Sequence, residues 1–209
     1  MTTFIGIDPG MASMCVAAIT DGWSSGLKNV SVRTLAVKKM TEGILDDHLR
    51  SKQLESSLRS LLFDLTPISK PRVCIHGEPI QRVVVTVEGP SFGRDPTRSL
   101  QTGFVHSAIY RAIEGKFAKN FNTVVVVSPP TVLKKFVSGK GTASKGTMIE
   151  CTIRRWFKAG VPSWGSDDKY DAFGLAMLGV EVLNGKAERF NTQKVRAHVY
   201  EMFQGEFIC

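Results

Sequence analysis

Apolar residues in the first forty positions form three short runs separated by turn residues. The runs at 3–8, 13–20 and 30–37 have strand length and are rich in Ile, Val and Ala. A Pro-Gly pair follows the first run, and "DGWSSG" separates the second run from the third. Because links this short join antiparallel neighbours, the pattern predicts a three-stranded meander.

Beyond this region, helical patterns alternate with short apolar runs. Between residues 44 and 65, leucines recur three and four positions apart, which predicts an amphipathic helix that ends before Pro67. The β-branched run "VVVTV" predicts a buried strand over 82–89. Further elements are expected as a strand at 123–128 and helices at 96–117, 129–139, 147–160 and 167–183. This order predicts an α/β fold with a mixed sheet, in which strands reached through helical crossovers run parallel to the first.

Length and composition favour one domain. The chain has 209 residues, of which 43% are hydrophobic, enough for one substantial core. We expect that domain over residues 1–185 and a C-terminal extension over 186–209 that packs on it or trails from it. No signal-peptide pattern and no apolar stretch of the ~18 residues that cross a bilayer is present in the sequence, so we expect a soluble intracellular protein without a membrane partner.

The four cysteines are far apart in the sequence and form no C-x-x-C pair. This spacing favours reduced thiols over a disulfide framework or a zinc site.

Positive charge is concentrated in the second half of the chain. The net charge is +8, and residues 131–160 hold seven Lys or Arg against one acid, Glu150. A cluster of this kind is typical of proteins that bind polyanions. Taken alone, the cluster would be better explained as a solvated basic face.

Four carboxylates occupy positions from which they could meet. Asp8 and Glu88 each close an apolar strand, and Asp168 and Asp171 are three apart on one face of a predicted helix. Asp167, four positions before Asp171, could replace Asp168 in that pair. Each acid could also be a turn or helix cap. Several carboxylates packed together repel one another unless a cation binds among them, and hard oxygen donors suit Mg²⁺ or Mn²⁺.

A carboxylate cluster beside a basic segment points to phosphodiester hydrolysis. Two metal ions ~3.5–4 Å apart can activate water and stabilise the leaving 3′-oxygen. The basic residues would then hold neighbouring phosphates.

Four stretches of the sequence resemble one known family in the same order along the chain. They are "IGIDPG" at 5–10, "VTVEGPSFG" at 85–93, "LKKFVSGKGTASKG" at 133–146 and "DDKYDAFGLAM" at 167–177. Together they resemble the RuvC-like Holliday junction resolvases of the ribonuclease-H-like nuclease superfamily, over about residues 3–183. The first stretch alone is a weak signal, whereas the four in order are specific.

The resemblance implies a fold, a chemistry and a partner. The fold would be a ribonuclease-H-like mixed five-stranded sheet, an antiparallel meander followed by parallel strands, flanked by helices. The activity would be that of a crossover junction endodeoxyribonuclease: a homodimer making paired nicks in a four-way DNA junction, in DNA recombination and repair, with two Mg²⁺ or Mn²⁺ per active site. A cytoplasmic location, in a bacterium or a phage-infected host, is expected.

The resemblance also assigns residues to roles. The catalytic, metal-binding set would be Asp8, Glu88, Asp168 and Asp171. The residues expected to contact DNA are Lys134, Lys140, Lys145, Phe92 and Arg94.

Some alternatives stay open at the level of sequence. Glu78 competes with Glu88 for the Glu role, and we favour Glu88 because the helix after it fits the family and Glu78 lies in a turn-like Gly-Glu-Pro. A ribonuclease H-type or general branched-DNA nuclease would use the same chemistry. A non-catalytic DNA-binding module would require the four acids to be structural. "GIDPG" also resembles the opening of actin-like ATPases, for which this chain is short.

Overall fold

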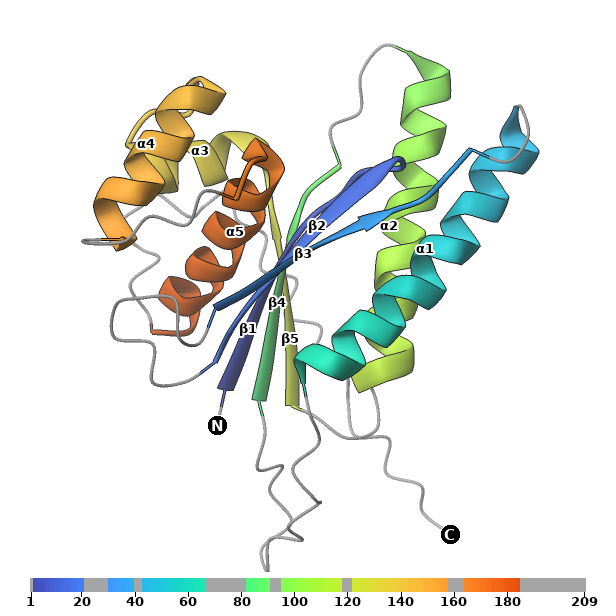
Figure 1. Cartoon of the computed structure of the whole chain (residues 1–209), viewed down its shortest axis with the longest axis horizontal. Coiled ribbons are helices and arrows are strands. Elements are labelled where there is room, and N and C mark those ends of the chain that lie inside the picture. The colour runs from blue at the N-terminus through green and yellow to red at the C-terminus, as the bar shows by residue number, and fades with distance from the viewer. Residues whose placement is uncertain are drawn as a thin grey trace, which may run out of the picture.

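The fold is a five-stranded mixed sheet with helices on both faces (Figure 1). The computed structural model describes residues 2–20, 30–39, 43–66, 82–90, 95–117, 122–157 and 164–184. Its strands are β1 (Thr2–Asp8), β2 (Ser13–Thr20), β3 (Val30–Ala36), β4 (Arg82–Glu88) and β5 (Asn122–Ser128). Its helices are α1 (Ile44–Leu65), α2 (Pro96–Phe117), α3 (Pro130–Ser138), α4 (Lys145–Trp156) and α5 (Asp167–Leu183).

The sheet has the order β3-β2-β1-β4-β5. β1, β2 and β3 pair antiparallel, while β4 and β5 run parallel to β1. The antiparallel part follows from the short links between the first strands. The parallel part follows from the helical crossovers α1 and α2, which return the chain to the same end of the sheet. The predicted fold class is confirmed, and the predicted extension at 186–209 lies outside the described residues.

Two apolar cores cover the two faces of the sheet. Along β1, Ile5 and Ile7 pack into the core shared with α1 and α2, whereas Phe4 packs into the core shared with α3, α4 and α5. This alternation is the two-residue period of a strand. In Figure 1, α1 and α2 accordingly lie on one side of the sheet, and α3, α4 and α5 on the other.

Gly6 lets α5 approach the sheet closely. A Cβ at this position would overlap the Ala172 carbonyl oxygen and the Ala176 amide nitrogen, and would lie 2.9 Å from the Cβ of Leu175. No residue with a side chain fits there without moving the helix. The absence of a side chain at Gly6 therefore sets the distance between the helix and the strand that ends in Asp8.

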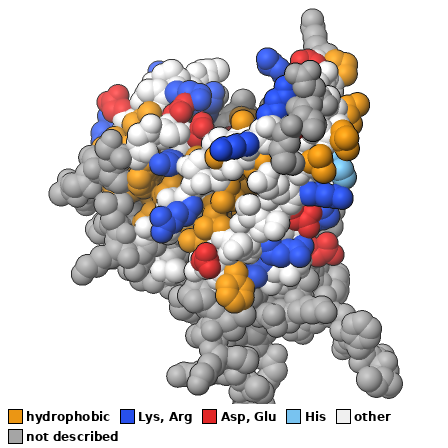
Figure 2. All heavy atoms as spheres, turned by 45° about the vertical axis from the view of Figure 1, so that its right-hand side comes forward, with side chains coloured by type: hydrophobic (Ala, Val, Ile, Leu, Met, Phe, Trp, Pro, Cys, Tyr) orange, Lys and Arg blue, Asp and Glu red, His pale blue; other side chains and the backbone are white. Residues whose placement is uncertain are grey.

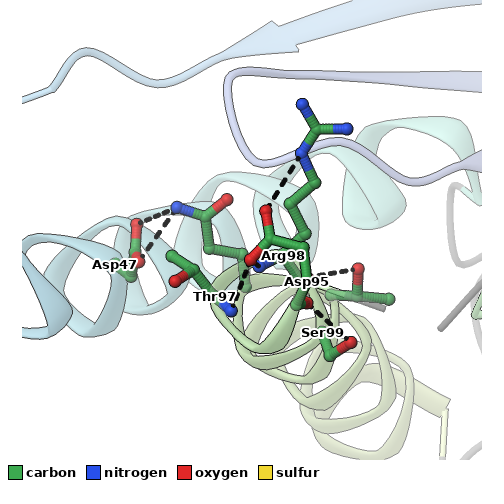
Figure 3. Close-up of polar contacts among 7 residues, drawn as sticks. Asp47, Asp95, Thr97, Arg98 and Ser99 are labelled. Atoms are coloured by element: carbon green, nitrogen blue, oxygen red, sulfur yellow. Dashed lines mark hydrogen bonds and ion pairs between the residues drawn. The ribbon is translucent and has the colours of Figure 1, made fainter. Parts of the chain in front are cut away.

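Polar contacts at the start of α2 fix this helix beside α1 (Figure 3). Asp95 Oδ1 accepts hydrogen bonds from the amides of Thr97 and Arg98, at 2.9 and 3.4 Å, and so satisfies donors of the first turn. Gln101 Nε2 donates to both carboxylate oxygens of Asp47 in α1, at 3.1 and 3.3 Å. The N-terminal ends of α1 and α2 are thereby tied together.

α4 differs from its predicted bounds at both ends. It begins at Lys145 rather than residue 147, because Ser144 caps the helix and its Oγ accepts from the Thr147 amide at 3.3 Å. It ends at Trp156 rather than residue 160, with Phe157 as the C-cap. No helix within the described ranges is long and apolar enough to cross a membrane.

Candidate active site

Asp8 and Glu88 are the last residues of two neighbouring parallel strands. β1 and β4 pair in a register that places Ile7 opposite Val87, so the two acids follow at the same edge of the sheet. The predicted meeting of these strands is confirmed. Glu88 in turn pairs with Ser128 at the end of β5.

The strand period turns both acids toward the same helix. Phe4, Gly6 and Asp8 share one face of β1, and Gly6 lies against α5. On β4, Thr86 and Glu88 share the corresponding face, because the Thr86 hydroxyl lies beneath Gly179 of α5. Both carboxylates therefore belong to the α5 face of the sheet.

The first turns of α5 carry the other acids. Asp167 and Asp168 lie in the first turn, and Asp171 follows one turn later. Negative charge here is favoured by the helix dipole. Since α5 packs on β1, β2 and β4, its N-terminal end brings these acids to the edge where Asp8 and Glu88 end their strands.

Electrostatic coupling shows how closely the acids are grouped. The pKa of Asp8 is raised to about 8, chiefly by burial and in addition by the charges of Glu88, Asp171 and Asp168, while Lys145 opposes the shift. The pKa of Glu88 is raised to about 7, chiefly by burial and in addition by the charge of Asp171, while Lys134 opposes the shift. Each acid thus lies in the field of others from a different element of the fold.

Asp171 belongs to the same group. Burial raises its pKa to about 6; Lys145 and Lys134 oppose the shift, while Asp167 and Asp168 add to it. Removal from water disfavours the charged form of each buried acid, and neighbouring acids disfavour it again. The result is a group of carboxylates short of positive charge.

Asp167 and Asp168 differ in their surroundings. Asp167 forms an ion pair with Lys145, and this contact lowers the pKa of Asp167. Asp168 lies 3.7 Å from the same ammonium, and its charge raises the pKa of Asp8. This placement favours Asp168 over Asp167 as a partner of Asp8.

The predicted basic residues fall into two groups. Lys134 on α3 and Lys145 on α4 both act on the acids, since each lowers the pKa of Asp171. Lys140 is exposed in the link between these helices. Glu78, Phe92 and Arg94 lie outside the described residues.

The donor set fits a hard divalent cation. Four carboxylates from β1, β4 and α5 supply only oxygen ligands, and the raised pKa values of three of them indicate a deficit of positive charge. As the side chains lie, no three His, Cys, Asp or Glu residues in the described part of the chain are close enough together to hold one ion. Closure around a cation would therefore require side chains to move, most directly Asp168 away from Lys145.

A hollow of about 290 Å³ opens beside Glu88. Its walls come from the turn after β1, the end of β4 and the first half of α2, and include Gln101 and His106. His106 is 7% exposed and its Nδ1 is buried without a hydrogen-bond partner. Sequence reasoning did not single out these α2 residues, because a histidine within an apolar helical pattern carries no local signal of a site.

Figure 2 shows how charge is spread over the side of the molecule that carries α1 and α2. Lys and Arg side chains are scattered there with acidic ones between them, and apolar side chains lie among both. This face is therefore not a continuous basic surface. The lysines that act on the carboxylates belong to α3 and α4 instead.

Comparison with solved structures decides which fold this is. One structure of Thermus thermophilus RuvC superposes with a TM-score of 0.59 at 14% identity, covering 90% of this chain and 97% of that one. It is described as RuvC in complex with Holliday junction substrate. A second Thermus thermophilus RuvC structure gives a TM-score of 0.53 at 18% identity, with 88% and 97% covered. The chain has a RuvC-like fold.

The RuvC-like fold was predicted from four short stretches of sequence, and the structural comparison confirms it over most of the chain. No family model and no curated protein matches the sequence. At such low identity the likeness establishes the architecture, while the roles of individual residues rest on the site itself.

Proposed function

We propose that the chain is a metal-dependent, structure-selective DNA endonuclease that hydrolyses phosphodiester bonds in Holliday junctions and other branched DNA by paired nicking. The observation that carries this proposal is the grouping of Asp8, Glu88, Asp168 and Asp171 at one sheet edge of a RuvC-like fold. A purely structural role would group buried acids whose charged forms are disfavoured both by burial and by one another.

In this proposal, strands and a helix of the fold fix the positions of the four acids. Asp8 and Glu88 are held by the ends of two paired strands, which position side chains more precisely than loops do. Asp168 and Asp171 are held by α5, seated on the sheet through Gly6. The four would hold two Mg²⁺ or Mn²⁺ ions, which would supply a bound water of lowered pKa and neutralise charge on the leaving oxygen.

The remaining residues would bind the DNA. Lys134 and Lys145 lie beside the acids and would contact phosphates near the scissile bond, while the exposed Lys140 would contact a phosphate farther away. Phe92 and Arg94 remain proposed DNA contacts. A homodimer would present two such sites to the two strands of a junction.

The experiment that tests this function is cleavage of a panel of substrates by the full chain. Four-way, three-way, flap, linear duplex and RNA–DNA hybrid substrates are incubated with Mg²⁺ or Mn²⁺. We expect the four-way junction to be cut in symmetrical pairs and linear duplex to be left intact. Preferential cutting of the hybrid would instead identify a ribonuclease H-type enzyme.

A variant of Asp8 tests whether the cleavage activity belongs to this site. Asp8→Asn keeps the size of the side chain and removes its charge, and we expect it to reduce cleavage by roughly 10³-fold or more, since several kcal/mol of charge stabilisation depend on the bound ions. Junction binding should survive. Glu114→Gln, on an exposed position of α2, is the control and should cut at the normal rate. Cleavage that is unchanged in Asp8→Asn would contradict the proposal.

A further inference from the structure

Lys145 connects the start of α4 to the start of α5, beside the four acids. Its backbone is fixed as the first residue of α4, directly after the Ser144 cap. Its side chain is 69% exposed and extends to the start of α5, where the ammonium contacts Asp167 and lies 3.7 Å from Asp168 Oδ1. Because this side chain is flexible and exposed while its backbone is fixed, the ammonium can exchange one ion-pair partner for another at little cost in free energy.

Lys145 is also the cation in closest contact with the acids. Within the described ranges, no other lysine or arginine forms an ion pair with Asp8, Glu88, Asp168 or Asp171. Lys134 influences Glu88 and Asp171 only through space. Two lysines therefore compensate the same acids, one by contact and one at a distance.

The contact of Lys145 with Asp168 conflicts with the proposed metal-binding role of Asp168. An oxygen that ligates a divalent ion cannot keep an ammonium close on the same side, because the two positive charges repel each other. The described side chains also need to move before three acids could share an ion. Both facts point to the same movement, a release of Asp168 by Lys145.

We propose that Lys145 is a displaceable counter-ion of this site. The inference rests on the proposed function. Before a metal ion binds, the Lys145 ammonium compensates Asp167 and Asp168. Metal binding at Asp168 displaces it, and the freed ammonium becomes available to a DNA phosphate. Lys145 thus competes with the metal in the free protein and assists DNA binding once the metal is in place.

Metal affinity of the full chain without DNA tests this competition. Mn²⁺ binding is measured by calorimetry for the wild type and Lys145→Ala, and its loss in Asp8→Asn assigns the signal to this site. Because an exposed ion pair contributes little, we expect Lys145→Ala to bind Mn²⁺ about two- to fivefold more tightly. Lys145→Arg restores the charge and should return the affinity toward that of the wild type.

Lys134→Ala is the matched control, since it removes one positive charge near the same acids without breaking an ion pair to them. We expect a smaller effect than for Lys145→Ala. Equal gains in the two variants would show a general effect of charge and overturn the proposal. An unchanged or weaker affinity in Lys145→Ala would overturn it too, as would absence of Mn²⁺ binding in every variant. Thermal melting of each variant verifies that it is folded.

The outcome is separable from that of the proposed function. Tighter Mn²⁺ binding by Lys145→Ala, together with no cleavage of any DNA by the wild type, would support the counter-ion role of Lys145 and contradict the proposed nuclease activity. Junction cleavage with Mn²⁺ affinities that do not depend on Lys145 would support the nuclease activity and contradict the counter-ion role.

Discussion

Asp8 and Glu88 end adjacent parallel strands in the same register and on the same face of the sheet. They are 80 positions apart in the sequence, yet the charge of Glu88 contributes to the raised pKa of Asp8. The fold holds these two acids together although the charge of Glu88 disfavours the ionisation of Asp8.

The stability of the protein should fall as the pH rises, when no divalent ions are added. Asp8 and Glu88 have folded-state pKa values of about 8 and 7, above the ordinary values of 3.8 and 4.5. Between the unfolded and folded values the native state binds more protons, so the free energy of unfolding decreases across this range. Glu88, Asp171, Asp168 and Lys145 are the charged groups that act on Asp8.

Asp8→Asn should remove part of the fall in the free energy of unfolding that occurs as the pH rises. We expect it to stabilise the protein by about 1–2 kcal/mol at pH 8, less than the full shift implies because water reaches the sheet edge. This corresponds to a melting temperature roughly 2–8 °C higher. The gain should shrink toward pH 4. Asp64→Asn, on an exposed position of α1, is the control, and an equal gain there would contradict the prediction.

Divalent ions should raise the melting temperature, and more at pH 8 than at pH 6. Carboxylates must lose their protons to ligate a metal, and Asp8 and Glu88 hold protons up to about pH 8 and 7. At a concentration about 100 times the dissociation constant, the ion stabilises the native state by ~2.7 kcal/mol. Differential scanning fluorimetry with Mg²⁺ or Mn²⁺ measures this. A shift that persists in Asp8→Asn would place the ion elsewhere.

Gly6→Ala should strongly destabilise the protein. The added Cβ would overlap the backbone of Ala172 and Ala176, so α5 would have to move away from β1. We expect a loss of more than ~2 kcal/mol in urea unfolding. Metal affinity should fall as well, because the shift would carry Asp168 and Asp171 away from Asp8.

Gly103→Ala is the opposite case and serves as the control. Gly103 lies in α2 with nothing within 4 Å of its Cβ position. Alanine is favoured over glycine inside a helix, so we expect a gain of about 0.5–1 kcal/mol. Similar losses in both variants would show that the close approach of α5 is not what constrains Gly6.

Salt dependence should separate the lysines that contact DNA from those that do not. If Lys134 and Lys140 each neutralise one phosphate, replacing either by alanine should reduce the slope of log K against log salt by roughly 1. Fluorescence anisotropy of a labelled four-way junction, at several salt concentrations, measures this slope. Lys52→Ala, on an exposed position of α1, should leave it unchanged.

The order of elements was predictable from the sequence, because local patterns determine it. Leucine spacing indicated α1, β-branched runs indicated β4 and β5, and short links indicated the meander. The acids were found for the same reason: Asp8 and Glu88 stand at the ends of apolar runs, and Asp168 and Asp171 share a helical spacing. The roles assigned to them stay predictions.

Tertiary structure decided which groups meet. The pairing of β1 with β4, on the side away from β2, places Asp8 beside Glu88, and the lack of a side chain at Gly6 brings α5 within reach. The contacts of Lys145 with Asp167 and Asp168, and the position of His106 beside the hollow, join residues from separate elements. Local periodicity records only which face of an element is buried. Which distant side chains share that burial, and how their charges shift one another, depends on the packing of the whole sheet and its helices.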